Sequence, residues 1–250
     1  MKLHVLFTLL WLGTNAVMAG DIKVAIGLSL PPYVIQESNS GMELDVVKEA
    51  LADCGHKVVP VYVPFARVPF TMKDGEVDAA ITVTEATGIQ AAFSDSHITY
   101  QNFAISLSKN KFVINQIEDL EKHSVAAFQN AKLYLGDRFK AMANANKRYG
   151  ERPHQVAQNI QLYNGRADVV VGDRNIFRYY NTEAAKQADV SQPVTFHELF
   201  PPTNYKVAFR NTTVRDAFNA ALAKMHKDGR YDAIIKKYTT EATPIKAKKS

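Results

Sequence analysis

Two passages of this chain repeat the same order of features, and this repetition constrains the fold more than any other part of the sequence. The passages are KDGEVDAAITVTEA, Lys73–Ala86, and YNGRADVVVGDRNI, Tyr163–Ile176. Each has a glycine, an aspartate, an apolar strand and then polar residues at the strand's carboxyl end. Open α/β sheets bind ligands at such strand ends. We therefore predict two lobes facing across a cleft, although any two strand–helix units share part of this pattern.

The rest of the chain alternates between strand-like and helix-like patterns, which predicts an α/β architecture. Apolar residues at helical spacing predict a helix over 43–54. The run over 77–83 is apolar enough for a strand that is buried on both faces. Farther along, we expect a helix that begins at Asn130 and continues past Phe139, and a short strand near residues 155–156.

The first 19 residues are typical of a cleavable signal peptide. Lys2 supplies a positive start, and the apolar run Val5–Leu12 is too short to span a bilayer. Small residues end this segment at Ala19, and no cysteine follows the cut to carry a lipid. The alternative is an N-terminal membrane anchor. We expect an exported protein in the periplasm of a two-membrane bacterium.

Composition excludes several kinds of site. Cys54 is the only cysteine, so neither a disulfide within the chain nor a cysteine-based metal site is possible. The seven histidines show no metal-ligand spacing, and nucleotide-binding and serine-hydrolase motifs do not occur. No cofactor and no metal are therefore expected. The net charge of +5 includes a lysine-rich tail, and no basic run interleaved with aromatics indicates nucleic-acid binding. We expect this tail to be solvated. The alternative is that it contacts a polyanion or a membrane.

Several short motifs occur in a characteristic order: Pro31-Pro32-Tyr33, Gly41, Asp45, Gly75-Glu76-Val77-Asp78, Phe93-Ser94-Asp95, Gly165-Arg166-Ala167-Asp168, Asp173 and Asp228-Gly229. With them, the chain from Asp21 to Tyr238 resembles the bacterial extracellular solute-binding proteins of family 3, the periplasmic receptors for polar amino acids. The resemblance implies the type II periplasmic-binding-protein fold, two α/β lobes joined by two hinge strands. It places a signal peptide at 1–19, a discontinuous first lobe at 20–102 plus 204–250, and a second lobe at 103–203.

The resemblance also implies roles for individual residues. Thr82, with Thr84 in the same turn, falls where the family hydrogen-bonds its ligand, and Asp173 falls where a carboxylate accepts the ligand ammonium. Tyr33 and Phe65 fall where aromatic rings line the cleft. Each residue also has a purely structural interpretation. Thr82 could bond to the backbone, Asp173 could cap a helix, and the aromatic rings could belong to the core.

Two departures from the family pattern concern the anionic end of a ligand. Thr87 stands where the receptors usually carry the arginine that binds the α-carboxylate, and Asn130-Ala131-Lys132 replaces a Gly-Thr-Thr helix start. A helix start still presents N–H groups that favour an anion. Lys132 and Arg67 are candidates to supply the missing positive charge. Our hypothesis is that a ligand amine faces Asp173, while the anionic end is held differently or is absent.

The resemblance predicts a monomeric binding protein that closes on a small-molecule ligand by hinge motion and is then recognised by an ABC-type permease. Two other functions stay open. Some proteins with this fold are periplasmic cyclohexadienyl dehydratases, and here acid–base chemistry would fall to Glu85, Asp173 and Lys132. The other is a ligand-sensing module that signals to a membrane partner.

Overall fold

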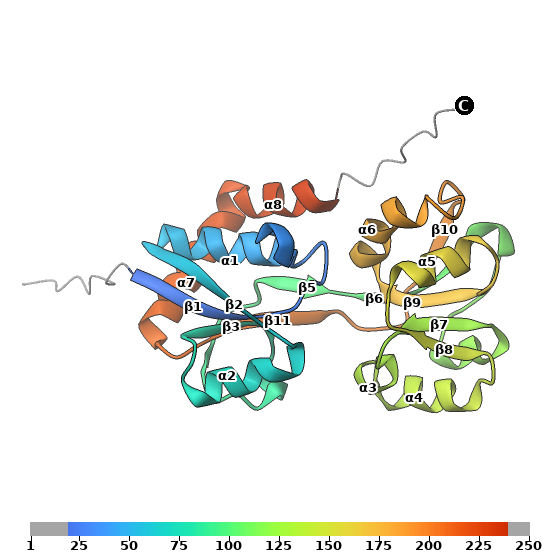
Figure 1. Ribbon diagram of the computed structural model, residues 1–250, viewed down its shortest axis with the longest axis horizontal. Coiled ribbons are helices and arrows are strands. Elements are labelled where there is room, and N and C mark those ends of the chain that lie inside the picture. The colour runs from blue at the N-terminus through green and yellow to red at the C-terminus, as the bar shows by residue number, and fades with distance from the viewer. Residues whose placement is uncertain (1–19, 240–250) are drawn as a thin grey trace, which may run out of the picture.

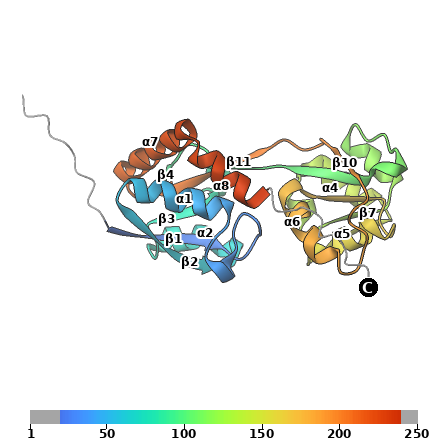
Figure 2. The same ribbon diagram turned by 90° about the horizontal axis from the view of Figure 1, so that it is seen from above.

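The computed structural model describes residues 20–239 and divides them between two α/β lobes that lie side by side (Figure 1). The predicted signal peptide and the lysine-rich tail lie outside the described residues. Each lobe holds one mixed sheet with helices on both faces, and extended segments connect the lobes (Figure 2). None of the helices in the described part of the chain is long and apolar enough to cross a membrane.

The first sheet has the strand order β2-β1-β3-β11-β4, with β5 paired to β11. These strands are β1 (Gly20–Gly27), β2 (His56–Val63), β3 (Ala79–Val83), β4 (Ala92–Phe93), β5 (Ile98–Tyr100) and β11 (Thr203–Phe209). Strands β1, β2 and β3 are parallel, so their carboxyl ends share one edge of the sheet, whereas β11 runs antiparallel to β3. Every residue of β3 is buried, which confirms the prediction of a strand covered on both faces.

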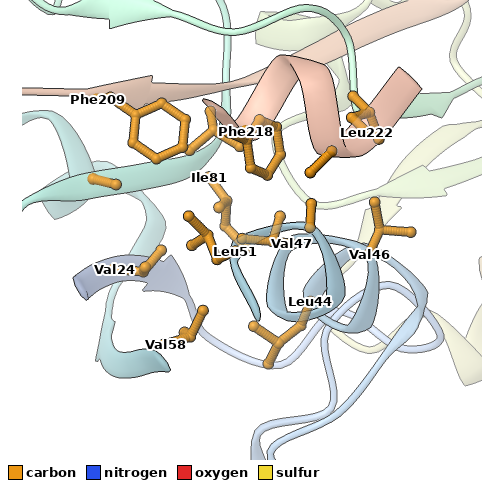
Figure 3. Packing of buried hydrophobic residues seen from close by; sticks show 14 of the residues in the cluster. Val24, Leu44, Val46, Val47, Leu51, Val58, Ile81, Phe209, Phe218 and Leu222 are labelled. Carbon is orange, nitrogen blue, oxygen red and sulfur yellow. The ribbon is translucent and has the colours of Figure 1, made fainter. Parts of the chain in front are cut away.

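Helices cover the first sheet unequally. The helices α1 (Met42–Asp53), α7 (Thr212–Asp228) and α8 (Arg230–Thr239) pack on one face, where Ile81 of β3, Phe209 of β11 and Phe218 of α7 belong to the main core cluster (Figure 3). The short α2 (Val68–Asp74) covers the other face through Val68 and Met72. Since neighbouring strand residues point to opposite faces, the apolar residues of β3 pack against both helix layers.

The second sheet has the order β10-β6-β9-β7-β8. Its strands are β6 (Asn102–Leu107), β7 (Val125–Phe128), β8 (Tyr149–Arg152), β9 (Val169–Asp173) and β10 (Val194–His197). One face is covered by α3 (Ala131–Tyr134), α4 (Gly136–Ala145) and the 3-10 helix η5 (Ile117–Lys122), and the other by α5 (Val156–Tyr163) and α6 (Arg174–Ala184). Further 3-10 helices are η1 (Gln36–Ser38), η2 (Phe65–Arg67), η3 (Glu85–Thr87) and η4 (Ser108–Asn110).

The chain passes between the sheets twice, from β5 into β6 and from β10 into β11. The lobe boundaries predicted at 102/103 and 203/204 fall at these passages. As boundaries of domains they stay a prediction.

Two local predictions are wrong. The helix expected to run on from Asn130 is interrupted, because α3 ends at Tyr134 and Gly136 takes a φ of 86°, which lies outside the right-handed helical region. Residues 155–156 form the start of α5 rather than a strand. The strand at this place is β8, an edge strand of sequence YGER with no β-branched residue to indicate it.

Candidate functional site

Several residues predicted for the site follow the carboxyl ends of strands in both lobes. They are Thr82 and Thr84 at the end of β3, Phe65 and Arg67 after β2, Asn130 after β7, and Asp173 as the last residue of β9. Parallel pairing among β1, β2 and β3, and among β7, β8 and β9, gathers these ends at one edge of each sheet. Figure 1 shows α2 of the first lobe opposite α3 of the second. The structure therefore brings the predicted residues to facing sides of the two lobes.

A buried carboxylate, Glu43 of α1, gathers several polar side chains at the end of β3. Glu43 is fully buried, and its Oε1 accepts a hydrogen bond of 2.8 Å from the Thr82 hydroxyl. His97 Nε2 lies 3.0 Å from the same oxygen, and the Tyr100 hydroxyl donates to Oε2 at 2.6 Å. Burying a carboxylate is costly unless donors surround it, and here three side chains do so. Thr82 thus directs its hydroxyl into the first lobe.

The backbone of Thr82 has an unusual conformation. Its φ is +58°, in the left-handed region that β-branched residues rarely enter. The pairing of β3 with β11 shifts at this point, because Val83 faces Lys206 while Ala80 faces Ala208. Two residues of β3 therefore lie opposite one residue of β11, which is the arrangement of a β-bulge. A conformation of this kind costs about 1–3 kcal/mol and persists only where its surroundings enforce it.

Tyr33 joins the two lobes. Its ring stacks on Tyr100 with 3.5 Å between the ring centroids, and its hydroxyl donates to Asp173 Oδ2 at 2.9 Å. Asn175 of α6 donates in turn to the Tyr33 hydroxyl at 3.1 Å. Tyr33 is fully buried, and burial and the neighbouring Asp173 raise the pKa of its phenol well above the usual 10. It is therefore a neutral donor at physiological pH.

Asp173 accepts four hydrogen bonds. Its Oδ1 caps α6 by accepting from the backbone N–H groups of Asn175 and Ile176, and its Oδ2 accepts from the Gln101 N–H and the Tyr33 hydroxyl. A carboxylate offers about four acceptor positions. Burial raises the pKa of this carboxyl above its ordinary 3.8, although the hydrogen bonds act in the opposite direction. The helix-cap interpretation is thus present in the structure, and a ligand ammonium would have to replace one of these donors.

The remaining predicted residues of the first lobe lie on its surface. Thr87 is exposed, and its hydroxyl donates to the Thr84 carbonyl, which closes the turn of η3. Thr84 is half-buried. Phe65 is 45% exposed, and the guanidinium of Arg67 has no hydrogen-bond or ion-pair partner among residues 20–239. Arg67 is therefore a positive charge on this lobe that no carboxylate within the described range pairs with.

The start of α3 is not free to bind an anion, contrary to the expectation for Asn130 and Lys132. Glu151 of β8 accepts hydrogen bonds from the backbone N–H groups of both residues, at 2.7 and 3.2 Å. The Tyr149 hydroxyl also donates to Glu151, and these hydrogen bonds keep the pKa of its carboxyl low despite partial burial. The Lys132 ammonium lies 5.8 Å from the centroid of the Tyr149 ring. The protein's own carboxylate fills this position.

The three residues considered for acid–base catalysis are not joined in the structure. Glu85 is exposed and pairs with Lys206 at 2.6 Å, which lowers the pKa of its carboxyl. Lys132 and Asp173 lie on different elements of the second lobe. No hydrogen bond or ion pair within residues 20–239 connects any two of the three. The described residues also contain no group of three His, Cys, Asp or Glu side chains that could hold a metal ion.

A cavity of about 320 Å³ lies between the lobes on the side of α6 and α8. Its walls come from the loop after β1 and from both helices: Pro32, Ile35, Asn175, Arg178, Tyr179, Thr182, Lys237, Tyr238 and Thr239. None of the residues predicted from the sequence lines it. Asn175 connects the cavity to the predicted residues, because its side-chain amide donates to the Tyr33 hydroxyl.

Residues 22–241 match the model of the bacterial extracellular solute-binding proteins, family 3. The chain belongs to this family. Two curated relatives match nearly the whole chain. A putative ABC transporter arginine-binding protein of Escherichia coli K12 is 27% identical, with 90% of this chain and 93% of that protein covered. An arginine-binding periplasmic protein of Mannheimia haemolytica is 24% identical, with 93% and 97% covered.

Solved structures confirm the fold of this solute-binding protein. An ancestral arginine-binding protein bound to arginine has a TM-score of 0.64 at 24% identity, over 89% of this chain and 99% of that one. An ancestral amino-acid-binding protein, a precursor of cyclohexadienyl dehydratase, has a TM-score of 0.62 at 21% identity, over 88% of this chain and 95% of that one. A histidine kinase sensor domain has a TM-score of 0.64 at 20% identity, over 87% of this chain and 95% of that one. At these identities the likeness shows the type II two-lobed fold alone.

Among the residues of this solute-binding protein that sequence reasoning missed, Glu43, Tyr100 and Glu151 contact predicted ones directly. A fourth, His97, contacts Glu43. Only Glu43 carries a recognisable signal. It stands between Met42 and Leu44 and shares a helix face with Val47, and an acidic residue on a buried helix face needs donors. The other three residues show no pattern that points to their partners, since those partners are distant in the sequence.

Proposed function

We propose that this protein captures a small polar ligand, amino-acid-like or amine-bearing, between its lobes in the periplasm and presents it to an ABC importer. The observation that carries this proposal is the meeting of strand carboxyl ends from both lobes, joined by the Tyr33–Asp173 hydrogen bond. Both relatives are named as arginine-binding proteins, which supports the ligand class. The Escherichia coli relative is named as a putative ABC transporter protein, which supports the partner. Hinge closure would then give the permease a distinct surface to recognise.

The hydrogen bonds of the site restrict how the ligand binds. An ammonium that reaches Asp173 would replace the Tyr33 hydroxyl, because that is the one side-chain donor to Asp173 from the opposite lobe among the described residues. A carboxylate would not bind at the start of α3, which Glu151 occupies, nor at Thr87. Arg67 is then the cation best suited to receive it. We thus expect an amine-bearing ligand whose anionic group, where it has one, is bound by Arg67.

Exposed apolar side chains near the strand ends add a second element of recognition. Leu28 follows β1 and is 50% exposed, and Phe65 follows β2. In the second lobe, Leu133 and Tyr134 of α3 are 70% and 63% exposed. Closure around a ligand would remove such surface from water, which favours binding. A ligand with an apolar part beside its amine fits this composition.

A thermal-shift screen of the refolded, ligand-free mature protein tests the proposal. The panel is amino acids, polyamines, small peptides and organic acids. A compound that binds only the folded state adds about 2.7 kcal/mol of stability at a hundredfold excess over its Kd. We expect the largest rise in Tm from amines with an apolar part. If no compound of the panel raises the Tm, the proposal is contradicted.

Two controls separate the functions that share this fold. Asp173→Ala should weaken binding of the best compound in the screen, and an unchanged affinity would contradict the role of Asp173. Incubation with prephenate and arogenate should leave both unchanged. Conversion of either compound would favour a dehydratase over a binding protein.

A further inference from the structure

The conformation at the end of β3 is supported by a contact inside the first lobe. Thr82 sits in the bulge with a left-handed backbone, and the one side-chain hydrogen bond that its hydroxyl donates goes to Glu43. Thr82 and Val83, at the bulge, are both buried. Thr84 is the first residue after them that reaches solvent. A bulge redirects the side chains that follow it. The direction in which Thr84 and η3 leave the sheet therefore depends on the conformation of Thr82.

Glu43 is suited to enforce that conformation because its own position is fixed. It lies in the first turn of α1 beside buried Leu44 and is completely excluded from solvent. His97 and Tyr100 are bound to its two oxygens in addition to Thr82. These three contacts engage both oxygens of the side chain and fix its orientation. Release of the Thr82 hydroxyl would leave one acceptor site of a buried carboxylate empty, which is unfavourable.

The same carboxylate is connected to the second lobe. Tyr100, bound to Glu43, stacks on Tyr33, and Tyr33 donates to Asp173. Asp173 in turn holds the Gln101 N–H and the start of α6. A continuous series of contacts thus runs from the bulge in β3, through the hinge strand β5, to the end of β9.

We propose that Glu43 is a positioning residue of the ligand cleft: it holds Thr82 in the left-handed bulge through the threonine hydroxyl and, through Tyr100 and Tyr33, ties that turn to Asp173 in the other lobe. The consequence for ligand recognition rests on the proposed function. The geometry itself does not, and it is testable on the mature protein with no compound added. In this arrangement Thr82 serves the cleft by the shape of its backbone, not by a hydroxyl offered to the ligand.

Amide hydrogen exchange of the full mature protein, followed by NMR, tests the proposal with a matched pair of variants. Thr71 is a second buried threonine of the first lobe, and its hydroxyl donates to the Val68 carbonyl at 2.8 Å, the same distance as in the Thr82–Glu43 bond. We expect Thr82→Val to accelerate exchange at the Thr87 and Gly88 amides roughly tenfold. Thr71→Val should leave these two amides unchanged. Equal acceleration in both variants would overturn the proposal.

Two further variants keep the test decisive where Thr82→Val lowers stability overall. Thr82→Gly loses the hydroxyl but takes positive φ without strain, so its turn amides should exchange within about threefold of wild type. Glu43→Gln keeps the size of the side chain, but its amide nitrogen cannot accept a hydrogen bond. It should accelerate both the Thr87 amide and, in the hinge, the Gln101 amide. If Glu43→Gln does not change exchange at the Gln101 amide, Glu43 does not link the two lobes. If the turn amides exchange as fast in Thr82→Gly as in Thr82→Val, the left-handed conformation of residue 82 does not protect the turn.

Discussion

Asp173 combines a structural role with a position between the lobes. Its donors come from its own helix, from the hinge segment at Gln101 and from Tyr33 of the opposite lobe. Burial penalises the ionised form and raises the pKa of the carboxyl, and the hydrogen bonds offset only part of this effect. The ionised side chain is therefore less favourable in the folded protein than in the unfolded chain.

This shift predicts how stability depends on pH. A carboxyl with a raised pKa in the folded state binds more protons there than in the unfolded chain, so its contribution to stability falls as pH rises above 3.8. Asp173→Asn removes the titration. The unfolding free energy of wild type minus that of Asp173→Asn should therefore decrease between about pH 4 and pH 7 in urea titrations.

Asp189→Asn provides the control, because hydrogen bonds from Ser191 lower the pKa of the exposed Asp189 carboxyl. The corresponding difference should not decrease with rising pH for this variant. A flat or rising difference for Asp173→Asn would show that burial does not dominate at that site.

At the scale of single residues, the sequence indicates where polar groups stand but not what they bind. Thr82 and Asp173 were predicted at strand ends, and both are there. The partner of Thr82 is Glu43, thirty-nine positions earlier, and Asp173 meets Tyr33 across the molecule. Such pairs arise from tertiary packing, which strand and helix periodicity does not encode.

The elements themselves follow from local patterns with few exceptions. The helix predicted over 43–54 is α1 at 42–53, because its apolar residues recur at helical spacing. The bulge in β3 has no signal in the sequence, since a β-branched residue rarely takes positive φ. The interruption at Gly136 was not predicted because it does not alter the periodicity of the surrounding residues. The edge strand β8 was not predicted because its sequence, YGER, has no β-branched residue.

The packing of α7 on the first sheet predicts a large effect of one substitution. Phe218 is fully buried and its ring centroid lies 5.3 Å from that of Phe209 in β11. Phe218→Ala should lower the free energy of unfolding by about 3–5 kcal/mol, because it removes apolar contacts and leaves a cavity. Urea unfolding of the variant and of wild type measures this change.

Phe70 of α2 is the matched control in the same lobe, since its side chain is 55% exposed. Phe70→Ala should change the stability by no more than about 0.5 kcal/mol. Comparable losses in the two variants would mean that α7 does not carry the core of this lobe.

For the whole molecule, the repeated strand–turn passages correctly indicated two α/β lobes. What they could not indicate is the contact between the lobes. The passages contain Asp173 and Asn175, but Tyr33 lies in a loop outside both, and its ring is placed by Tyr100 of the hinge. The relative position of the lobes thus depends on a residue that the internal repetition does not include.

The Tyr33 hydroxyl links the two lobes, so we expect its loss to favour more open arrangements of the empty protein. Tyr33→Phe keeps the ring that stacks on Tyr100 but loses the hydrogen bond to Asp173. A hydrogen bond to a charged group contributes about 1.5–3 kcal/mol, so the population should shift toward open arrangements by roughly tenfold to a hundredfold. Small-angle X-ray scattering of the ligand-free variant should show a larger radius of gyration than wild type. Tyr62→Phe is the control, because the Tyr62 hydroxyl donates to Asn39 within one lobe and its loss should leave the radius unchanged. If Tyr33→Phe and wild type scatter identically, the lobes are held by the hinge strands alone.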